Sequence, residues 1–245
     1  TPGRLIDLVK RNAVDLQKVK TVILDEADEM LSMGFKKELD EILEFLPKVE
    51  SKWLFSATMP DGIKQIVNEH MNANAHRITV SGSNVVNAKI EHKFVHCEDT
   101  EKFHVLLQFL NSVKGQRGIV FCRTRNTAKK VAAQLIAKNI AADAIHGDLL
   151  QKERDKVMRA FKNENLSIIV ATDIAARGID VADLTFVVHF QLPDQNEYYT
   201  HRSGRTARAG KEGISLVLAN GYDVRTIREY EKTLKISFSK VKSVK

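Results

Sequence analysis

Residues 21–28 read Thr-Val-Ile-Leu-Asp-Glu-Ala-Asp, a short apolar run that is followed at once by carboxylates. Consecutive apolar residues bounded by polar ones are typical of a strand that is buried in a parallel sheet. The same pattern recurs along the chain, at Trp53–Phe55, Ile119–Phe121, Ile168–Val170, Phe186–Val188 and Ile214–Leu218. We expect each of these runs, like residues 21–24, to form a buried strand.

Helical patterns separate the apolar runs. Apolar side chains at positions i, i+3, i+4 and i+7 lie on one face of a helix, and such stripes begin at Ile63, Phe103 and Ala128. Alternating strands and helices predict an α/β fold with mostly parallel sheets. Because these sheets bind ligands at the carboxyl ends of their strands, the segments after the apolar runs are the candidate sites.

The composition is that of a globular protein, with 43% hydrophobic and 28% charged residues in a chain of 245. No apolar run approaches the roughly 18 residues that a membrane-spanning helix needs. Cys97 and Cys122 are the only cysteines, which excludes a disulfide framework and a cysteine-rich zinc site, and the histidines show no zinc spacing. We expect a cytoplasmic monomer, because disulfides are rare in reducing compartments, and no membrane partner.

The charge is distributed unevenly. Residues 1–80 carry 11 basic and 13 acidic side chains, whereas residues 81–245 carry 27 basic and 18 acidic ones. The basic excess in the second part favours an anionic partner, with nucleic acid as the first choice. A generally basic surface without a specific partner is the alternative.

Composition also suggests where the domains meet. Ser81-Gly82-Ser83-Asn84 is small and polar, so we expect a linker over residues 81–88. Residues 89–236 supply a full alternation of strands and helices, enough for a domain that folds independently, whereas residues 1–80 have few elements for a parallel-sheet domain. The basic tail, 237–245, is either a nucleic-acid arm or a frayed terminus, and we favour the latter.

Three carboxylates follow the first apolar run, at Asp25, Glu26 and Asp28. Carboxylates at the end of a buried strand suit Mg²⁺, a hard cation that prefers oxygen ligands, and a neighbouring carboxylate can activate water. The alternative is a helix N-terminus, where acidic side chains complement the helix dipole. Ser56-Ala57-Thr58 also follows an apolar run, and by itself it is best explained as a helix cap, with Pro60 near the first helical position.

The segment from His201 to Gly210 holds three arginines spaced three residues apart, at 202, 205 and 208. Like charges at this spacing repel one another on a helix, so the arrangement favours a phosphate ligand, which guanidinium groups grip bidentately. Residues 171–180 combine a hydroxyl, carboxylates, a guanidinium and a glycine after another apolar run. This loop is either a second binding segment or an ordinary surface loop.

Taken together, these segments resemble the DEAD-box family of ATP-dependent RNA helicases. The motifs occur in the family's order over nearly the whole chain: Thr1–Arg4, Asp25–Asp28, Ser56–Thr58, Val120–Thr124, His146–Asp148, 171–180 and His201–Arg208. The resemblance implies two RecA-like parallel-sheet domains, of which the first is incomplete and lacks its phosphate-loop half, while the second is complete. It also implies ATP and Mg²⁺ as cofactors and RNA as a partner.

For ATP, the resemblance implies that Asp25 binds Mg²⁺ through water and that Glu26 activates the hydrolytic water. Arg205 and Arg208 would contact the γ-phosphate from the second domain, and Asp180 would contact the ribose. The residues expected to couple the nucleotide site to domain closure are Asp28, Ser56, Thr58 and His201. Hydrolysis would reverse that closure.

For RNA, the resemblance implies contacts to phosphate and the 2′-hydroxyl rather than to base edges, which gives RNA preference without sequence specificity. The positions expected to make them are Pro2, Gly3, Arg4, Arg123, Gly147, Asp148 and Thr172. Two other functions remain open: a non-catalytic RNA-binding module, or a DNA helicase of the same superfamily.

The chain lacks a phosphate-binding loop of the Gly-x-x-x-x-Gly-Lys-Ser/Thr type. Gly204–Lys211 is a false match, because five residues separate its glycines and Glu212 stands where a hydroxyl is needed. We expect the chain to be the later part of a longer protein, and we expect it to lack RNA-stimulated ATPase activity by itself.

Overall fold

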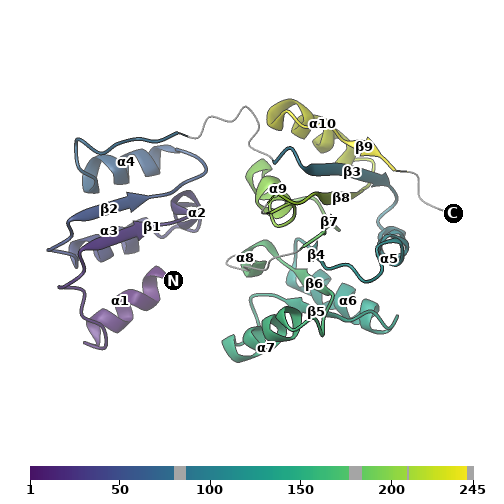
Figure 1. The fold of residues 1–245 in the computed structure, drawn as a ribbon, viewed down its shortest axis with the longest axis horizontal. Coiled ribbons are helices and arrows are strands. Elements are labelled where there is room, and N and C mark those ends of the chain that lie inside the picture. Colours follow the sequence, from purple (N-terminus) through teal and green to yellow (C-terminus); the bar gives the residue numbers. More distant parts are fainter. Residues whose placement is uncertain (80–86, 177–183, 209, 242–245) are drawn as a thin grey trace. The chain divides into compact units, whose positions relative to one another are not determined.

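A computed structural model describes residues 1–79, 87–176, 184–208 and 210–241 (Figure 1). The chain divides into two compact units, Thr1–Val80 and Ser81–Lys245, which we call unit 1 and unit 2. The expected α/β fold with parallel sheets is confirmed in both. No helix in the described part of the chain is long and apolar enough to cross a lipid bilayer.

Unit 1 is a two-stranded parallel sheet with helices. Its elements are α1 (Pro2–Lys10), β1 (Thr21–Leu24), α2 (Ala27–Ser32), α3 (Lys36–Glu44), β2 (Ser51–Leu54) and α4 (Asp61–His70). The core is formed by buried side chains that include Ile6, Leu39, Ile63 and Ile66. The α4 side chains belong to the stripe that the sequence predicts, so the helical periodicity is confirmed there.

The strands of unit 1 are not buried as expected. Ile23 on β1, Trp53 on β2 and Phe55 just after β2 are 60%, 53% and 51% exposed. Ile23 and Trp53 are register partners, and the Trp53 and Phe55 rings stack with centroids 6.4 Å apart. An apolar run shows that a strand can be buried on both faces, but not that both faces are covered within this chain.

Unit 2 is built on a seven-stranded parallel sheet of order β5-β6-β4-β7-β8-β3-β9. The strands are β3 (Ile90–His96), β4 (Gly118–Phe121), β5 (Ala142–Ile145), β6 (Ile168–Ala171), β7 (Phe186–His189), β8 (Gly213–Ala219) and β9 (Ser239–Lys240). The helices are α5 (Lys102–Ser112), α6 (Arg125–Ile136), α7 (Gln151–Lys162), α8 (Asp173–Ala176), α9 (Asn196–Ser203) and α10 (Asp223–Leu234).

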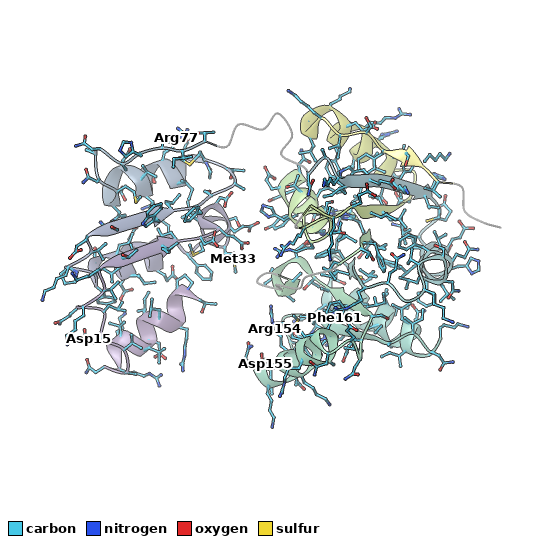
Figure 2. All side chains as sticks on the ribbon, viewed as in Figure 1. Asp15, Met33, Arg77, Arg154, Asp155 and Phe161 are labelled. Carbon is cyan, nitrogen blue, oxygen red and sulfur yellow. The ribbon has the colours of Figure 1, made fainter. Side chains whose placement is uncertain are left out.

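The central strands of unit 2 are buried along their whole length, as their apolar runs predict. All four residues of β4, β6 and β7 are buried. On α7, Phe161 is fully buried whereas Asp155 is exposed, so one helix presents an apolar face to the core and a charged face to solvent (Figure 2). Gly118 on β4 packs directly against the Phe186 ring of β7, where a β-carbon would overlap the ring.

The described part of the basic tail, residues 237–241, departs from the expectation of a frayed terminus. Ser239 and Lys240 form β9, which pairs in parallel with Lys93 and Phe94 of β3. The backbone N–H of Val241 also donates to the carbonyl of Phe94 at 2.9 Å. Strand β3 would otherwise be an edge of the sheet, and pairing with β9 satisfies part of its exposed backbone. Most of the expected linker, residues 81–86, lies outside the described residues.

Candidate functional site

The carboxyl end of β1 presents two exposed carboxylates, those of Asp25 and Glu26. The Asp25 Oδ1 accepts a hydrogen bond from the backbone N–H of Glu26 at 2.9 Å. Glu26 has φ 50° and ψ 45°, in the left-handed region that non-glycine residues rarely adopt. Left-handed residues of this kind gather at functional sites, where the surrounding structure supports their strain, and here the strained residue is the predicted water activator.

Asp28, in contrast, is held by Thr58 across the two strand ends. Its Oδ2 accepts from the backbone N–H and from the hydroxyl of Thr58, both at 2.8 Å. Burial alone would raise the pKa of Asp28, but hydrogen bonds, those from Thr58 first, bring that pKa below its ordinary value. The four-residue segment 25–28 therefore contains both exposed and tied carboxylates.

The interpretation of Ser56-Ala57-Thr58 as a helix cap is wrong. Helix α4 begins at Asp61 with Pro60 as its N-cap, and it has no side-chain cap. The Ser56 hydroxyl instead donates to the carbonyl of Thr58 at 2.6 Å. The segment is a turn that directs Thr58 toward Asp28. The alternative interpretation of residues 25–28, a helix N-terminus with acidic side chains, is confirmed in part. Asp28 lies in the first turn of α2.

The predicted RNA positions of unit 1 lie at the start of α1. Pro2 and Gly3 open the helix, and the Arg4 side chain is 64% exposed and pairs with Asp7 at 2.9 Å. An exposed i, i+3 ion pair contributes little to stability. The Arg4 guanidinium can therefore exchange Asp7 for an anionic ligand at low energetic cost.

In unit 2, the predicted RNA position Arg123 lies two residues after the end of β4. Its guanidinium is half exposed and forms an ion pair with Asp194, and its backbone N–H donates to Gln191 Oε1 at 3.1 Å. The next residue, Thr124, caps α6, because its side chain accepts from the N–H of Thr127 at 3.1 Å. This cap fixes the direction in which the chain leaves the strand.

Gly147 and Asp148 follow β5 and are exposed. Asp148 accepts from Lys129 at 3.0 Å and from Arg125 at 2.6 Å, both on α6. The Lys129 hydrogen bond, followed by the charge of Arg125, holds the pKa of Asp148 below its ordinary value. A β-carbon at Gly147 would meet nothing within 4 Å, so the backbone there is open to a ligand.

Thr172 lies between β6 and α8 and is partly exposed. Its carbonyl accepts from the N–H of Ala176, and its own N–H donates to Ile145 on the neighbouring strand β5 at 3.3 Å. Asp173 opens α8 directly after it. The predicted ribose contact, Asp180, lies outside the described residues.

The expectation that three arginines grip phosphate is wrong for Arg202. This residue is 1% exposed, and its Nε and Nη2 donate to the two carboxylate oxygens of Asp173 at 2.6 and 2.7 Å. Its Nη1 donates to the carbonyl of Gln191 at 2.7 Å. Spacing alone could not reveal this, because the partner carboxylate is 29 residues away in sequence.

The other two arginines follow α9. Arg205 is partly exposed and Arg208 is exposed, with the Arg208 Nε donating to the carbonyl of Gly204 at 3.1 Å. Between them, Thr206 is buried and donates to the carbonyl of Leu184 at 2.6 Å. Ala207 has φ 57°, so it adopts the left-handed conformation, as Glu26 does. His201, on α9, is partly exposed.

A buried polar network that sequence analysis missed holds α9 against the sheet. It consists of His92 (β3), His189 (β7), Ser215 (β8), and Tyr199 and Ser203 (α9). Tyr199 Oη lies 2.5 Å from His92 Nδ1 and 3.2 Å from Ser215 Oγ. Ser203 Oγ lies 2.9 Å from Ser215 Oγ. The available signal was Ser215, a polar residue within the apolar run Ile214–Leu218.

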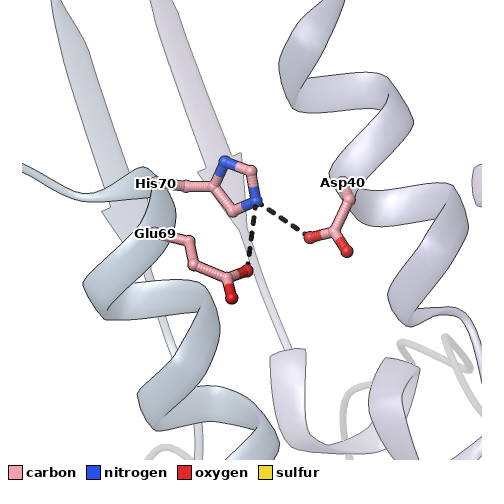
Figure 3. A group of neighbouring side chains, drawn as sticks. All are labelled: Asp40, Glu69 and His70. Carbon is pink, nitrogen blue, oxygen red and sulfur yellow. Dashed lines mark hydrogen bonds and ion pairs between the residues drawn. The ribbon is translucent and has the colours of Figure 1, made fainter.

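Asp40, Glu69 and His70 form a further cluster of possible metal ligands, between α3 and α4 (Figure 3). His70 Nε2 lies 2.8 Å from Asp40 Oδ1 and 4.0 Å from Glu69 Oε2. The Lys36 ammonium pairs with both carboxylates, at 2.9 Å with Asp40 and 3.4 Å with Glu69. The Lys36 ammonium balances one of the two carboxylate charges, and His70 contacts both carboxylates, so the cluster is a salt-bridge network between the two helices.

Comparison with known proteins agrees with the placement of these motifs. The family model described as DEAD/DEAH box helicase matches residues 1–66, and the helicase conserved C-terminal domain matches residues 101–210. Among solved structures, Saccharomyces cerevisiae Dbp5 bound to RNA and ADP BeF3 is 29% identical with a TM-score of 0.90, covering 99% of this chain and 64% of that one. A DEAD box protein from Methanococcus jannaschii is 41% identical with a TM-score of 0.61, covering 98% and 65%.

Curated relatives agree with this assignment. The DEAD-box ATP-dependent RNA helicase CshA of Bacillus cereus is 40% identical over 235 residues, which are 96% of this chain and 45% of the relative. The CshA protein of Geobacillus kaustophilus is 38% identical, over 99% of this chain and 52% of the relative. The chain spans about half the length of the curated relatives that it matches. With both family models and these relatives in agreement, the chain belongs to the DEAD-box helicase family.

Proposed function

We propose that the full-length protein carrying this chain is an ATP-dependent RNA helicase. The observation that carries this proposal is the division of the 25–28 carboxylates into two groups. Asp25 and Glu26 are exposed at a strand end, whereas Asp28 is tied to Thr58. Nucleotide hydrolysis uses the exposed carboxylates of Asp25 and Glu26 and also the carboxylate of Asp28 that is hydrogen-bonded to Thr58. RNA binding alone requires none of them.

The residues at this strand end fit a magnesium–nucleotide complex. Asp25 offers an exposed carboxylate, and carboxylate oxygen is the ligand type that Mg²⁺ prefers. When bound, Mg²⁺ would neutralise charge on the phosphate oxygens. In this proposal Asp25 holds the ion through water, Glu26 accepts a proton from the attacking water, and Arg205 and Arg208 stabilise charge that develops on the γ-phosphate.

RNA is the proposed partner, as in the Dbp5 structure that contains it. The proposed contacts are those at Pro2–Arg4 and Arg123, the open backbone at Gly147–Asp148, and Thr172. Among them, Arg4 and Arg123 carry half-exposed or exposed guanidinium groups whose acidic partners are also on the surface. A phosphate group can replace such a partner with little loss of stability. We also propose that the protein is a monomer. A cytoplasmic location is proposed because both cysteines are free thiols, as is usual in reducing compartments.

The test is Glu26→Gln in the full-length protein, assayed for ATP hydrolysis and for RNA binding. We expect hydrolysis to fall by at least about a hundredfold, because general base catalysis contributes roughly 10²–10⁴ in rate, while the affinity for RNA changes less than about threefold. Glu44→Gln, at an exposed glutamate on α3, is the matched control and should be active.

Three results would contradict the proposal. Unchanged hydrolysis in Glu26→Gln would remove the catalytic role of this site. RNA binding without ATP hydrolysis in the wild type would favour a non-catalytic RNA-binding module. Equal stimulation of hydrolysis by matched DNA and RNA strands would favour a DNA helicase. The ratio of the two stimulations therefore needs to be measured in the wild type first.

A further inference from the structure

Arg202 is the point at which three segments of unit 2 meet. Its guanidinium is 1% exposed, binds both carboxylate oxygens of Asp173, donates to the carbonyl of Gln191, and lies 5.1 Å from the centre of the Phe121 ring. These contacts connect α9 to α8, to the segment after β7, and to the end of β4. A single buried side chain therefore contacts all of these segments.

A buried ion pair is a poor source of net stability. The cost of removing both charges from water offsets most of their attraction, and apolar residues of similar volume stabilise a core as well or better. The bidentate pairing of a guanidinium with a carboxylate does, however, impose a strict relative orientation. The Asp173–Arg202 pair therefore contributes mainly a fixed orientation of α9 relative to α8, and little net stability.

Both partners of Arg202 adjoin a proposed RNA contact. Asp173 directly follows Thr172 in the chain. Gln191, whose backbone carbonyl accepts from Arg202, also uses its side-chain oxygen to accept from the N–H of Arg123 at 3.1 Å. Arg202 therefore contacts Asp173, which adjoins Thr172 in the chain. It also contacts Gln191, which is hydrogen-bonded to Arg123.

The other end of this connection is the arginine segment. Arg202 is the penultimate residue of α9, and the N–H of Arg205 donates to the carbonyl of Arg202 at 3.1 Å. A shift of the Arg202 backbone therefore displaces Arg205. Such a shift can in turn reach Arg208, whose guanidinium is anchored to the carbonyl of Gly204 within the same turn.

We propose that Asp173 and Arg202 are positioning residues, and that their ion pair couples RNA contact at residues 123 and 172 to the placement of the arginine segment 204–208. The proposal rests on the proposed function, since it assigns a regulation to the same site. RNA that orders the segment around Thr172 would fix Asp173, and the bidentate pair would then fix α9 in the orientation that its arginines need. Because such coupling is reciprocal, nucleotide contact at the arginines would also strengthen RNA binding.

The first experiment measures hydrogen exchange in the full-length protein with and without a single-stranded oligouridylate. In the wild type we expect RNA to slow exchange in peptides covering residues 171–176 and also in those covering 201–208. In Asp173→Asn the slowing at 171–176 should persist, whereas the slowing at 201–208 should fall at least threefold. A merely structural role would change exchange at both segments with or without RNA.

The second experiment measures ATP hydrolysis by the same proteins. We expect the ratio of the RNA-stimulated rate to the rate without RNA to fall at least tenfold in Asp173→Asn. Arg202→Lys keeps the charge but loses the two-pronged geometry, so we expect it to lose the coupling as well. If Asp173→Asn does not fold, Arg202→Lys tests the coupling in its place. The thermal unfolding midpoint of each variant is measured to check that it is folded.

The matched control is Asp223→Asn. Asp223 is 20% exposed and pairs with Lys102, which is 4% exposed, whereas Asp173 is 23% exposed and pairs with Arg202, which is 1% exposed. Both changes therefore weaken an ion pair of similar burial in unit 2. The control should lower the unfolding midpoint but leave the RNA-stimulated ratio within twofold of the wild type.

The outcomes separate this inference from the proposed function. The inference is overturned if Asp173→Asn and Arg202→Lys keep the wild-type ratio and the RNA-dependent slowing at 201–208, or if the control loses both equally. A wild-type protein with no RNA-dependent slowing at 171–176 and no RNA-stimulated hydrolysis would instead contradict the proposed function itself.

Discussion

At the scale of single residues, Thr58 gives Asp28 an environment that Asp25 and Glu26 do not share. Its N–H and hydroxyl both donate to one carboxylate oxygen. These bonds favour the ionised form of Asp28 and lower its pKa against the effect of burial. The charge of Asp28 is thereby kept over a wider pH range, while its neighbours stay exposed for ligands.

Thr58→Val should raise the pKa of Asp28, because it removes the hydroxyl donor, whose hydrogen bond contributes most to lowering that pKa. A lowered carboxyl pKa stabilises the fold above the ordinary pKa near 3.8, and that contribution is lost as the pH falls through the folded value. Carboxyl carbon NMR titration would measure the change. Thr58→Ser keeps the hydroxyl and should titrate like the wild type, and an unchanged pKa in the valine variant would contradict the assignment.

His92 makes the stability of unit 2 depend on pH. Burial lowers the pKa of His92 from 6.5 to about 4, so the folded protein keeps the ring neutral where the unfolded chain already binds a proton. The free energy of unfolding should therefore fall as the pH drops from about 6.5 toward 4, and be insensitive to this group above pH 7.

Replacing the ring tests this effect. The loss of unfolding free energy between pH 7 and pH 5, measured by urea denaturation, should be smaller in His92→Gln than in the wild type. His76→Gln, at an exposed histidine, should show the full wild-type loss. Equal losses in all three proteins would mean that His92 does not contribute.

At the scale of elements, β8 is packed tightly against the segment that carries the arginines. A β-carbon at Gly213 would overlap the Thr206 side chain and lie 2.8 Å from the backbone nitrogen of Ala207. Ala207 is itself held in a left-handed conformation, and Asn87 donates to its carbonyl at 2.7 Å. The close approach of two backbones therefore requires glycine at position 213.

Gly213→Ala should destabilise unit 2 by about 1–3 kcal/mol, the usual cost of inserting a group into a well-packed site. Gly221→Ala is the matched control, because a β-carbon there meets nothing within 4 Å. Chemical denaturation of both variants would measure the difference. A Gly213→Ala protein as stable as the control would show that the segment around Thr206 can move aside.

At the scale of the whole molecule, the two units have separate cores. The clusters around Leu39 and Ile63 lie in unit 1, and those around Val120, Ile169 and Tyr230 lie in unit 2, with no described core cluster shared between them. Each unit can therefore unfold without disrupting the buried contacts of the other.

We expect two unfolding transitions, and the chain carries the probes to separate them. Its single tryptophan, Trp53, is in unit 1, whereas its four tyrosines are all in unit 2. Tryptophan fluorescence should report the transition of unit 1, and tyrosine absorbance should report that of unit 2. Coincident transitions by both probes, under every denaturant condition, would contradict independent folding.

Local patterns in the sequence account for part of the fold. Apolar runs predicted β4, β6, β7 and β8 because four successive buried residues leave a strong local pattern. Strand β5 was missed, since Ala142–Ile145 is short and includes Asp143, and β9 was missed because two residues carry no periodicity. The motifs follow apolar runs in the sequence. Because parallel strands end at the same edge of a sheet, this position predicts that the motifs lie at that edge.

By itself, the sequence determined the α/β class, the family resemblance and the positions of the carboxylate and arginine motifs. Only the tertiary structure decided which of those side chains are available. It tied Asp28 to Thr58, placed Arg202 against Asp173, and left Ile23 and Trp53 exposed. The physical reason is that periodicity and motif spacing record neighbours along the chain. The burial and pairing of a side chain depend on residues that the sheet topology brings together from 29 or 30 positions away.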